Sequence, residues 1–149
     1  ITQHFNMPDL HVQPDIIHAV SYLARSNDID RIVALDDYDV ATAATLREHL
    51  RLPGLGETQA RYFRDKLGMR TQAAANAIRV PAFTPVFNYD LLRDYMARVE
   101  PPWVLKPRFE AGAIGIRKLH DSEAVWRALD ELGDEQSFYL LEQFVPGDV

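Results

Sequence analysis

Lys106 is the residue whose type and surroundings most clearly indicate chemistry. It lies in an otherwise apolar stretch, residues 103–107, where an unpaired ammonium group is costly. A loop that contains Gly112 and Gly115 follows shortly after it. A lysine at the end of a strand, facing such a loop, can neutralise phosphate oxygens while loop N–H groups donate hydrogen bonds to them. The alternative is a lysine on the solvent face of an edge strand, where it opposes aggregation.

Two other short motifs could bind ligands, and each also has a structural explanation. Residues 36–39 (Asp-Asp-Tyr-Asp) could hold a metal, but they lack the spacing of a calcium loop and have the residue types of helix caps. Residues 54–56 (Gly-Leu-Gly) begin like a dinucleotide-binding fingerprint, but Gln59 replaces the third glycine and no strand precedes them. We expect capping in the first case and a chain break in the second.

The elements before this region predict part of an open α/β sheet. Asp15 is expected to cap a helix whose apolar residues keep near-helical spacing. Residues 32–35 are a continuous apolar run between charged residues, which is typical of a buried parallel strand. A second helix is expected from Val40. Helix, strand and helix in this order indicate an α/β fold, of which about fifty residues can make only part.

The rest of the chain predicts helices first and then a β-containing unit. Prolines and glycines separate the segments, and Asn88 and Ser122 are of the residue types that cap helices. The last third is expected to run strand, turn, strand, helix, strand. The expected helices span residues 57–64, 65–78 and the segments after Asn88 and Ser122, and the expected strands span residues 103–107, 114–119 and 138–142.

The composition is that of a globular protein, and we expect a cytoplasmic location. Hydrophobic residues make up 47% and charged residues 26% of the 149 residues, and no signal peptide or membrane-spanning run is visible. The absence of cysteine excludes disulfides, thiolate zinc sites and cysteine nucleophiles. The net charge of −6 and the scattered basic residues argue against a nucleic-acid partner. Because the chain starts at Ile1 and not at Met, we expect sequence upstream.

The order of three short segments resembles the ATP-grasp superfamily, which includes biotin carboxylase, D-alanine ligase and the synthetase subunit that makes carbamoyl phosphate. Residues 65–70 (Asp-Lys-Leu-Gly-Met-Arg) resemble the family's first lysine segment, and residues 104–107 (Val-Leu-Lys-Pro) resemble its second. Residues 141–147 (Leu-Glu-Gln-Phe-Val-Pro-Gly) resemble the hinge that cups adenine. The resemblance extends over about residues 30–149, although each motif alone is weakly specific.

This resemblance implies that the chain is an amino-terminal fragment of an ATP-grasp ligase. The fold class would be α/β, with a partial open parallel sheet followed by a small α+β lid made of a hairpin, a helix and a strand. Residues 1–54 would be part of the preceding α/β domain, and residues 55–149 would begin the ATP-grasp domain. The lid subdomain would occupy about residues 101–149, and the carboxyl-terminal half of the fold would be absent.

The resemblance also implies which residues bind the phosphates. Lys66 and Lys106 would contact the nucleotide phosphates, with Lys106 also near the adenine. The loop from Gly112 through Ile114 to Gly115 would close over the phosphates as a flexible lid, since glycines let the backbone approach closely. Glu110 departs from this pattern, because a carboxylate beside phosphate is repulsive unless it points away or pairs with a cation such as Arg108.

The adenine would be read by the hinge. Glu142 would accept a hydrogen bond from the adenine amino group, while the backbone of Gln143, Phe144 and Val145 would contact the edge of the base. The alternative for Glu142 is a carboxylate exposed at the end of a strand. The family usually places a ribose-contacting carboxylate shortly after the hinge glycine, and Asp148 is the nearest match to that pattern in this chain.

The magnesium ligands of the family lie in a later Glu-x-Asn motif, which this sequence does not contain. We therefore expect ATP as the ligand here, with Mg²⁺ held outside these residues, and no catalytic residue in the fragment itself. The implied activity is that of an ATP-dependent carboxylate–amine ligase acting through an acyl phosphate. The alternative is a non-catalytic nucleotide-binding or interaction module. The expected partners are ATP and a carboxylate substrate, and formation of a homodimer stays open.

Overall fold

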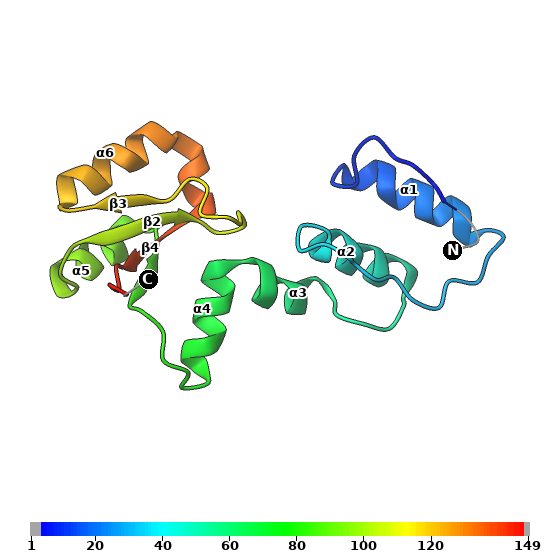
Figure 1. Cartoon of the computed structure of the whole chain (residues 1–149), viewed down its shortest axis with the longest axis horizontal. Coiled ribbons are helices and arrows are strands. Elements are labelled where there is room, and N and C mark those ends of the chain that lie inside the picture. Colours follow the sequence, from blue (N-terminus) through cyan, green and yellow to red (C-terminus); the bar gives the residue numbers. More distant parts are fainter. Residues whose placement is uncertain (1–3, 148–149) are drawn as a thin grey trace. The chain divides into compact units, whose positions relative to one another are not determined.

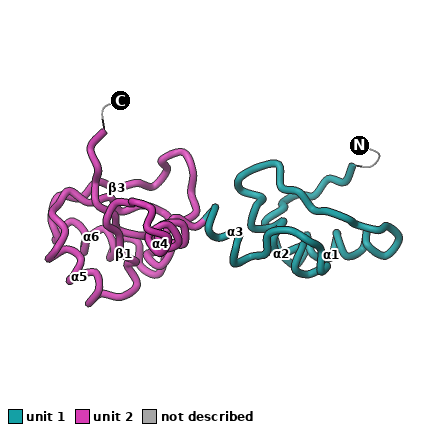
Figure 2. Tube along the Cα trace, turned by 90° about the horizontal axis from the view of Figure 1, so that it is seen from below, with its two compact units in different colours: residues 1–64 teal, residues 65–149 magenta. Residues whose placement is uncertain are grey.

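The computed structural model describes residues 4–147, so Asp148 lies outside the described residues. The chain divides into two compact units, one ending at Arg64 and the other beginning at Asp65 (Figure 2). The domain boundary expected after residue 54 rests on the family resemblance and stays a prediction. None of the helices in the described part of the chain has the length and hydrophobicity needed to cross a membrane.

The described residues of the first unit form three helices: α1 Gln13–Ala24, α2 Val40–Leu50 and α3 Glu57–Arg64 (Figure 1). The expected cap of α1 is wrong, because the helix begins two residues before Asp15, with Pro14 and Asp15 in its first turn. Proline is favoured there because an N–H group in the first turn has no acceptor within the helix, so proline loses no hydrogen bond by lacking one. The buried hydrophobic residues of this unit are mostly small: Ile16, Ala43, Ala44, Leu46 and Ala60.

The strand expected at residues 32–35 does not form in the described structure. The segment is not a strand, and the residues Val33 and Leu35 are 71% and 96% exposed. A buried parallel strand needs neighbouring strands on both sides and helices on both faces. The only sheet in the described residues has four strands, all in the second unit, so this apolar segment has no strand to pair with.

The glycines at residues 54–56 let side chains of α2 approach the loop closely. A Cβ on Gly54 would lie 2.7 Å from the Arg47 side chain, and one on Gly56 would lie 2.1 Å from the Glu48 carboxylate. Arg47 is buried and donates to the carbonyls of Leu55 at 2.9 Å and Ile32 at 2.8 Å. The break expected at these glycines is confirmed, because they lie between the end of α2 and the start of α3. The close approach of Arg47 and Glu48 explains why glycine is needed there, and no dinucleotide has to be invoked.

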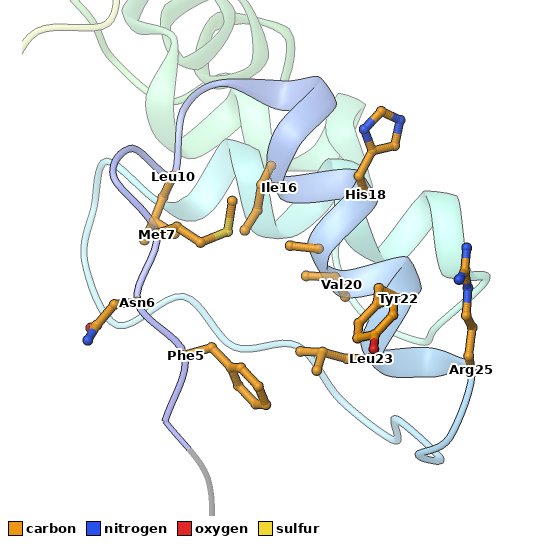
Figure 3. Close-up of a pocket in the computed structure, with 11 residues that line it drawn as sticks. Phe5, Asn6, Met7, Leu10, Ile16, His18, Val20, Tyr22, Leu23 and Arg25 are labelled. Carbon is orange, nitrogen blue, oxygen red and sulfur yellow. The ribbon is translucent and has the colours of Figure 1, made fainter.

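The first unit also contains an apolar cavity of about 710 Å³. Figure 3 shows Phe5 and Met7 of the amino-terminal segment facing the same space as Ile16, Val20 and Leu23 of α1. No residue to which the sequence assigned a role in binding lines this cavity.

The second unit is built around a four-stranded antiparallel sheet with strand order β1-β4-β2-β3 (Figure 1). The expected order of strand, turn, strand, helix and strand in the last third is confirmed. A further strand before it, at residues 83–85, was not predicted. The strands are β1 Phe83–Pro85, β2 Trp103–Pro107, β3 Arg117–Leu119 and β4 Tyr139–Gln143, and the helices are α4 Lys66–Ala75, α5 Tyr89–Arg98, α6 Ser122–Leu132 and the short 3-10 helix η1 Gly133–Phe138.

One face of this sheet carries the hydrophobic core. Leu105 and Leu141 are directly opposite each other on β2 and β4, and both are fully buried. Residues of α5 and α6 complete the same cluster, and together they form a continuous core. Its buried members are Val86, Leu92, Tyr95, Trp103, Leu105, Leu119, Val125, Ala128, Leu129 and Leu141.

Polar side chains fix where the helices of this unit begin. Asn88 caps α5 as expected, since its side chain accepts the N–H groups of Asp90 and Leu91, both at 3.1 Å. The cap expected at Ser122 is wrong by one residue. Asp121 caps α6 by accepting the N–H of Ala124 at 2.7 Å, and Ser122 is the first helical residue.

Candidate functional site

Lys106 and Glu142 meet on the face of the sheet opposite the core. Glu142 is directly opposite Val104, so Lys106 lies diagonally across from it, two residues further along β2. The Lys106 Nζ donates to Glu142 Oε1 at 2.6 Å, with only 12% and 8% of the two side chains exposed. The edge-strand alternative for Lys106 is wrong because β2 pairs with β4 on one side and β3 on the other. The alternative of an exposed carboxylate at Glu142 is also wrong.

Arg70 is the third member of this cluster, and it was not predicted as a site residue. Its Nε donates to Glu142 Oε2 at 2.8 Å, so the two carboxylate oxygens have different cationic partners. Arg70 lies one helical turn after Lys66 within the first lysine segment. The signal that could have identified it is Glu142 itself, because a glutamate within an apolar strand needs compensating positive charge.

The electrostatics of the cluster keep Glu142 ionised. Burial alone would raise the pKa of Glu142, but hydrogen bonds from Arg70 and Lys106 and the charges of these two groups outweigh it and hold the pKa below its usual range. Burial, followed by the negative charge of Glu142, raises the pKa of Tyr95. Two cations and one carboxylate give the cluster a surplus positive charge, which favours an anionic ligand.

A second buried ion pair attaches α4 to the end of β2. Asp65 caps α4 by accepting the N–H of Leu67 at 3.0 Å, and its carboxylate is also bound by the guanidinium of Arg108 through Nε at 2.9 Å and through a second nitrogen. Burial works to raise the pKa of Asp65, but the hydrogen bonds and charge of Arg108 and the N–H groups of Gly68 and Leu67 hold it below its usual range. Arg108, which was one possible partner for Glu110, is thus bound to Asp65.

Lys66 lies at the base of the glycine loop and not in the Glu142 cluster. Its backbone N–H donates to the carbonyl of Arg108 at 2.9 Å, and its Nζ donates to the carbonyls of Arg108, at 3.5 Å, and Glu110. The two lysines expected to contact phosphates thus bind different groups: the Lys66 Nζ binds loop carbonyls, and the Lys106 Nζ binds the Glu142 carboxylate. Lys66 holds the start of the loop, and Lys106 belongs to the sheet.

The glycine loop has a backbone that depends on two glycines. Gly112 and Gly115 have φ values of +67° and +71°, and Ala113 between them has +62°. A Cβ on Gly115 would lie 2.9 Å from Pro107 Cγ, whereas a Cβ on Gly112 would meet nothing within 4 Å. Ile114 is 63% exposed at the tip. The returning strand is shorter than expected, because residues 114–116 belong to this loop.

The hinge residues continue from β4, and part of their backbone is already engaged. The N–H of Gln143 donates to the carbonyl of Ala82 at 2.8 Å, and that of Phe144 donates to the carbonyl of Pro102 at 3.1 Å. Val145 is exposed. Contact with the edge of a base through this segment would therefore use its carbonyl groups and the N–H of Val145.

The described residues do not provide a metal site. Within residues 4–147 there is no group of three or more histidine, aspartate or glutamate side chains arranged to hold an ion. In the run at residues 36–39, Asp36 accepts the N–H of Tyr38 at 2.9 Å, and Asp37 pairs with Arg64. Asp39 occupies the position before α2 without a side-chain capping bond, so the expected capping of this helix is wrong. These carboxylates are used for turn structure and ion pairing.

Comparison with known proteins gives similar folds but no sequence match. No protein-family model and no curated protein matches the chain. An L-amino acid ligase from Bacillus licheniformis has a TM-score of 0.70 at 22% identity, over 95% of this chain and 32% of that protein. The N5-carboxyaminoimidazole ribonucleotide synthetase from Thermus thermophilus has a TM-score of 0.59 at 28% identity, over 77% of this chain and 30% of that protein.

A third solved structure, a RimK domain protein of the ATP-grasp type from Sphaerobacter thermophilus, has a TM-score of 0.54 at 18% identity. The match extends over 95% of this chain and 63% of that protein. The chain thus spans about a third of the length of the two ligases above and a larger part of this shorter protein.

Proposed function

Because this chain has the fold of part of an ATP-grasp ligase, we propose that its second unit forms the adenine and phosphate portion of an ATP site. Lys106 and Lys66 bind phosphate oxygens, and the loop from Gly112 to Gly115 closes over them. Glu142 accepts a hydrogen bond from the adenine amino group.

The observation that carries this proposal is the buried cluster of Lys106, Glu142 and Arg70 on the face of the sheet opposite the core. Burying three charges costs free energy, and packed apolar residues would stabilise a sheet at least as well. The surplus cation lies in β2, whose last residue, Pro107, contacts the glycine loop closely. A cation at such a position suits a phosphate chain, which needs positive charge together with backbone N–H donors.

The protein that contains this chain is proposed to be an ATP-dependent carboxylate–amine ligase, or one that uses a similar nucleophile. A carboxylate oxygen of the substrate attacks the γ-phosphorus, and ADP leaves. The nucleophile then attacks the carbonyl carbon of the acyl phosphate, and inorganic phosphate leaves with the oxygen that came from the carboxylate. Mg²⁺ would neutralise charge on the phosphates, and its ligands are expected outside residues 4–147.

The nucleotide site is tested by ATP titration of the natural protein that contains this chain. Lys106→Ala and Glu142→Ala should each weaken ATP binding by about tenfold or more, since each removes a charged group from a buried site. Arg127→Ala and Glu131→Ala are matched controls, because both residues are on α6 and each makes an exposed ion pair. Unchanged ATP affinity in both site variants contradicts the assignment. Glu142→Gln, which keeps the shape of the side chain, replaces Glu142→Ala if the latter does not fold.

The ligase reaction is tested with substrate carboxylates labelled with ¹⁸O. If an acyl phosphate forms, one labelled oxygen must appear in the released inorganic phosphate. ATP binding without any phosphate release across a panel of carboxylic acids and amines would contradict the ligase proposal and leave nucleotide binding in place.

A further inference from the structure

Glu142 has more positive charge around it than one carboxylate requires. Arg70 approaches from α4 and binds Oε2, while Lys106 approaches from β2 and binds Oε1. The Arg70 side chain is 22% exposed and that of Glu142 is 8% exposed, so this contact is largely shielded from water. Either cation alone would neutralise Glu142.

The proposed ATP site makes conflicting demands on Lys106. Its Nζ is 2.6 Å from Glu142, and an ammonium group that turns toward a phosphate must weaken this contact. A carboxylate left buried without a cation is strongly destabilised, and it would take up a proton to become neutral. A protonated Glu142 would have one oxygen less available as an acceptor for an amino group.

We propose that Arg70 is a positioning residue of the nucleotide site, which keeps Glu142 ionised and oriented when Lys106 moves to the nucleotide phosphates. This inference rests on the proposed function. Arg70 itself does not contact the nucleotide. It acts through Glu142, and its guanidinium remains charged at any pH relevant to the protein.

Three titratable groups in the described part of the chain interact electrostatically with Glu142: Arg70 of α4, Lys106 of β2 and Tyr95 of α5. Tyr95 donates its hydroxyl to the carbonyl of Ala82 at 3.0 Å, and burial raises its pKa further from neutrality. Only the two cations can therefore compensate the charge of Glu142 between about pH 6 and 8.

The sign of the expected pH effect follows from this set of groups. In Arg70→Met without nucleotide, Lys106 still holds the pKa of Glu142 low. When ATP draws Lys106 away, burial raises the pKa of Glu142 and the carboxylate takes up a proton. ATP binding to this variant should therefore become stronger relative to wild type as pH falls. In the wild-type protein Arg70 prevents this proton uptake.

The test is calorimetric titration of MgATP into the natural full-length protein between about pH 6 and 8, in two buffers of different ionisation enthalpy. Arg70→Met should bind ATP about tenfold more weakly than wild type near pH 8, and the difference should shrink toward pH 6. It should also take up more protons per ATP than wild type. The affinity of each variant for ATP is divided by the wild-type affinity at the same pH. This ratio removes the contribution of the nucleotide's own phosphate titration.

Three variants make the result specific to Arg70 and Glu142. Arg70→Lys should restore most of the affinity and remove the extra proton uptake. Glu142→Gln combined with Arg70→Met should show no pH-dependent difference from Glu142→Gln alone, because no carboxylate remains to be protonated. Arg127→Met is the matched control, since Arg127 binds Glu123 at the same 2.8 Å but is 67% exposed.

The outcomes separate this inference from the proposed function. If wild-type protein does not bind ATP, the proposed function fails. If wild type binds ATP and Arg70→Met shows wild-type affinity, or a loss that does not change with pH and involves no extra proton uptake, the inference fails while nucleotide binding stands. Arg70→Gln, a neutral donor at the same position, provides the same test if Arg70→Met does not fold.

Discussion

The two units of this chain use apolar residues in different ways. In the second unit, four strands pair with one another and a core of ten buried residues fills one face of the sheet. Among the described residues of the first unit, three of the five buried hydrophobic residues are alanines, and Val33 and Leu35 of the apolar run at residues 32–35 are exposed. An apolar run becomes a strand only where other strands are available to pair with it.

The pattern of exposed residues in residues 32–35 supports the same conclusion. Val33 and Leu35 are exposed, while Ile32 and Ala34 are partly buried. Alternation of this kind is the geometry of a strand with one covered face. The described residues show this alternation of exposure without any pairing to another strand.

The largest expected difference between the units is in the cost of losing a core leucine. Leu141→Ala should reduce the free energy of unfolding of the second unit by about 4 kcal/mol. Leu141 is fully buried in an inner strand, where neighbouring residues cannot move to fill the cavity that the substitution leaves. Leu46→Ala in the first unit should cost about half of this, since most of the other buried hydrophobic residues described in that unit are alanines. Urea unfolding followed by tryptophan fluorescence reports on the second unit, which contains Trp103 and Trp126, and hydrogen exchange reports on both. Equal losses would mean that the two cores are equally packed.

The next largest effect is expected from the buried pair of Asp65 and Arg108. Arg108→Met should destabilise the second unit by about 3 kcal/mol, because it leaves the Asp65 carboxylate buried with backbone N–H groups as its remaining partners. Arg117→Met is the control, since Arg117 binds Glu131 at 2.6 Å in an exposed pair, and it should cost less than about 1 kcal/mol. The measurement is urea unfolding at neutral pH. Similar costs for the two variants would show that burial does not distinguish these pairs.

A smaller effect is expected in the glycine loop. Gly115→Ala should cost about 2 kcal/mol, because its φ is positive and the new Cβ would approach Pro107 Cγ to 2.9 Å. Gly112→Ala shares the positive φ but meets no atom within 4 Å, so it should cost about 1 kcal/mol. Thermal unfolding of both variants checks the order. A larger loss at Gly112 would contradict the close contact between Gly115 and Pro107.

The smallest effect is expected at Leu35 in the exposed segment of the first unit. Leu35→Ser should change stability by less than about 0.5 kcal/mol, since 96% of this residue is exposed. Hydrogen exchange of the peptides that cover residues 32–35 is the measurement. A loss of several kcal/mol in the natural protein would show that another segment covers Leu35 there.

The sequence was sufficient to predict the elements whose signals are local. Asn88 marks the start of α5 because a side-chain acceptor at that position satisfies N–H groups within the same turn. The apolar residues around Lys106 predict the strand, and the cost of an unpaired ammonium group within it predicts an anionic ligand. The similarity to ATP-grasp folds was also predictable from the order of the short motifs.

The contacts that the sequence did not predict are those that join distant segments. Arg70 and Glu142 are separated by 72 residues, and Asp65 and Arg108 by 43. Neither pair has a local pattern, because the partners meet only after α4 has packed against the sheet. β1 was not predicted for the same reason, since its three residues are identified as a strand only by their pairing with β4.

The position of β4 between β1 and β2 has a consequence for synthesis of the protein. β4 comes last in the sequence of this sheet, so β1 leaves the ribosome with no strand beside it and β2 with one edge unpaired. The edges of β1 and β2 that β4 will cover stay unpaired until residues 139–143 emerge. An unpaired strand edge can pair with another chain. A nascent chain arrested before Tyr139 should therefore be the form of this protein most prone to aggregation and most in need of a chaperone.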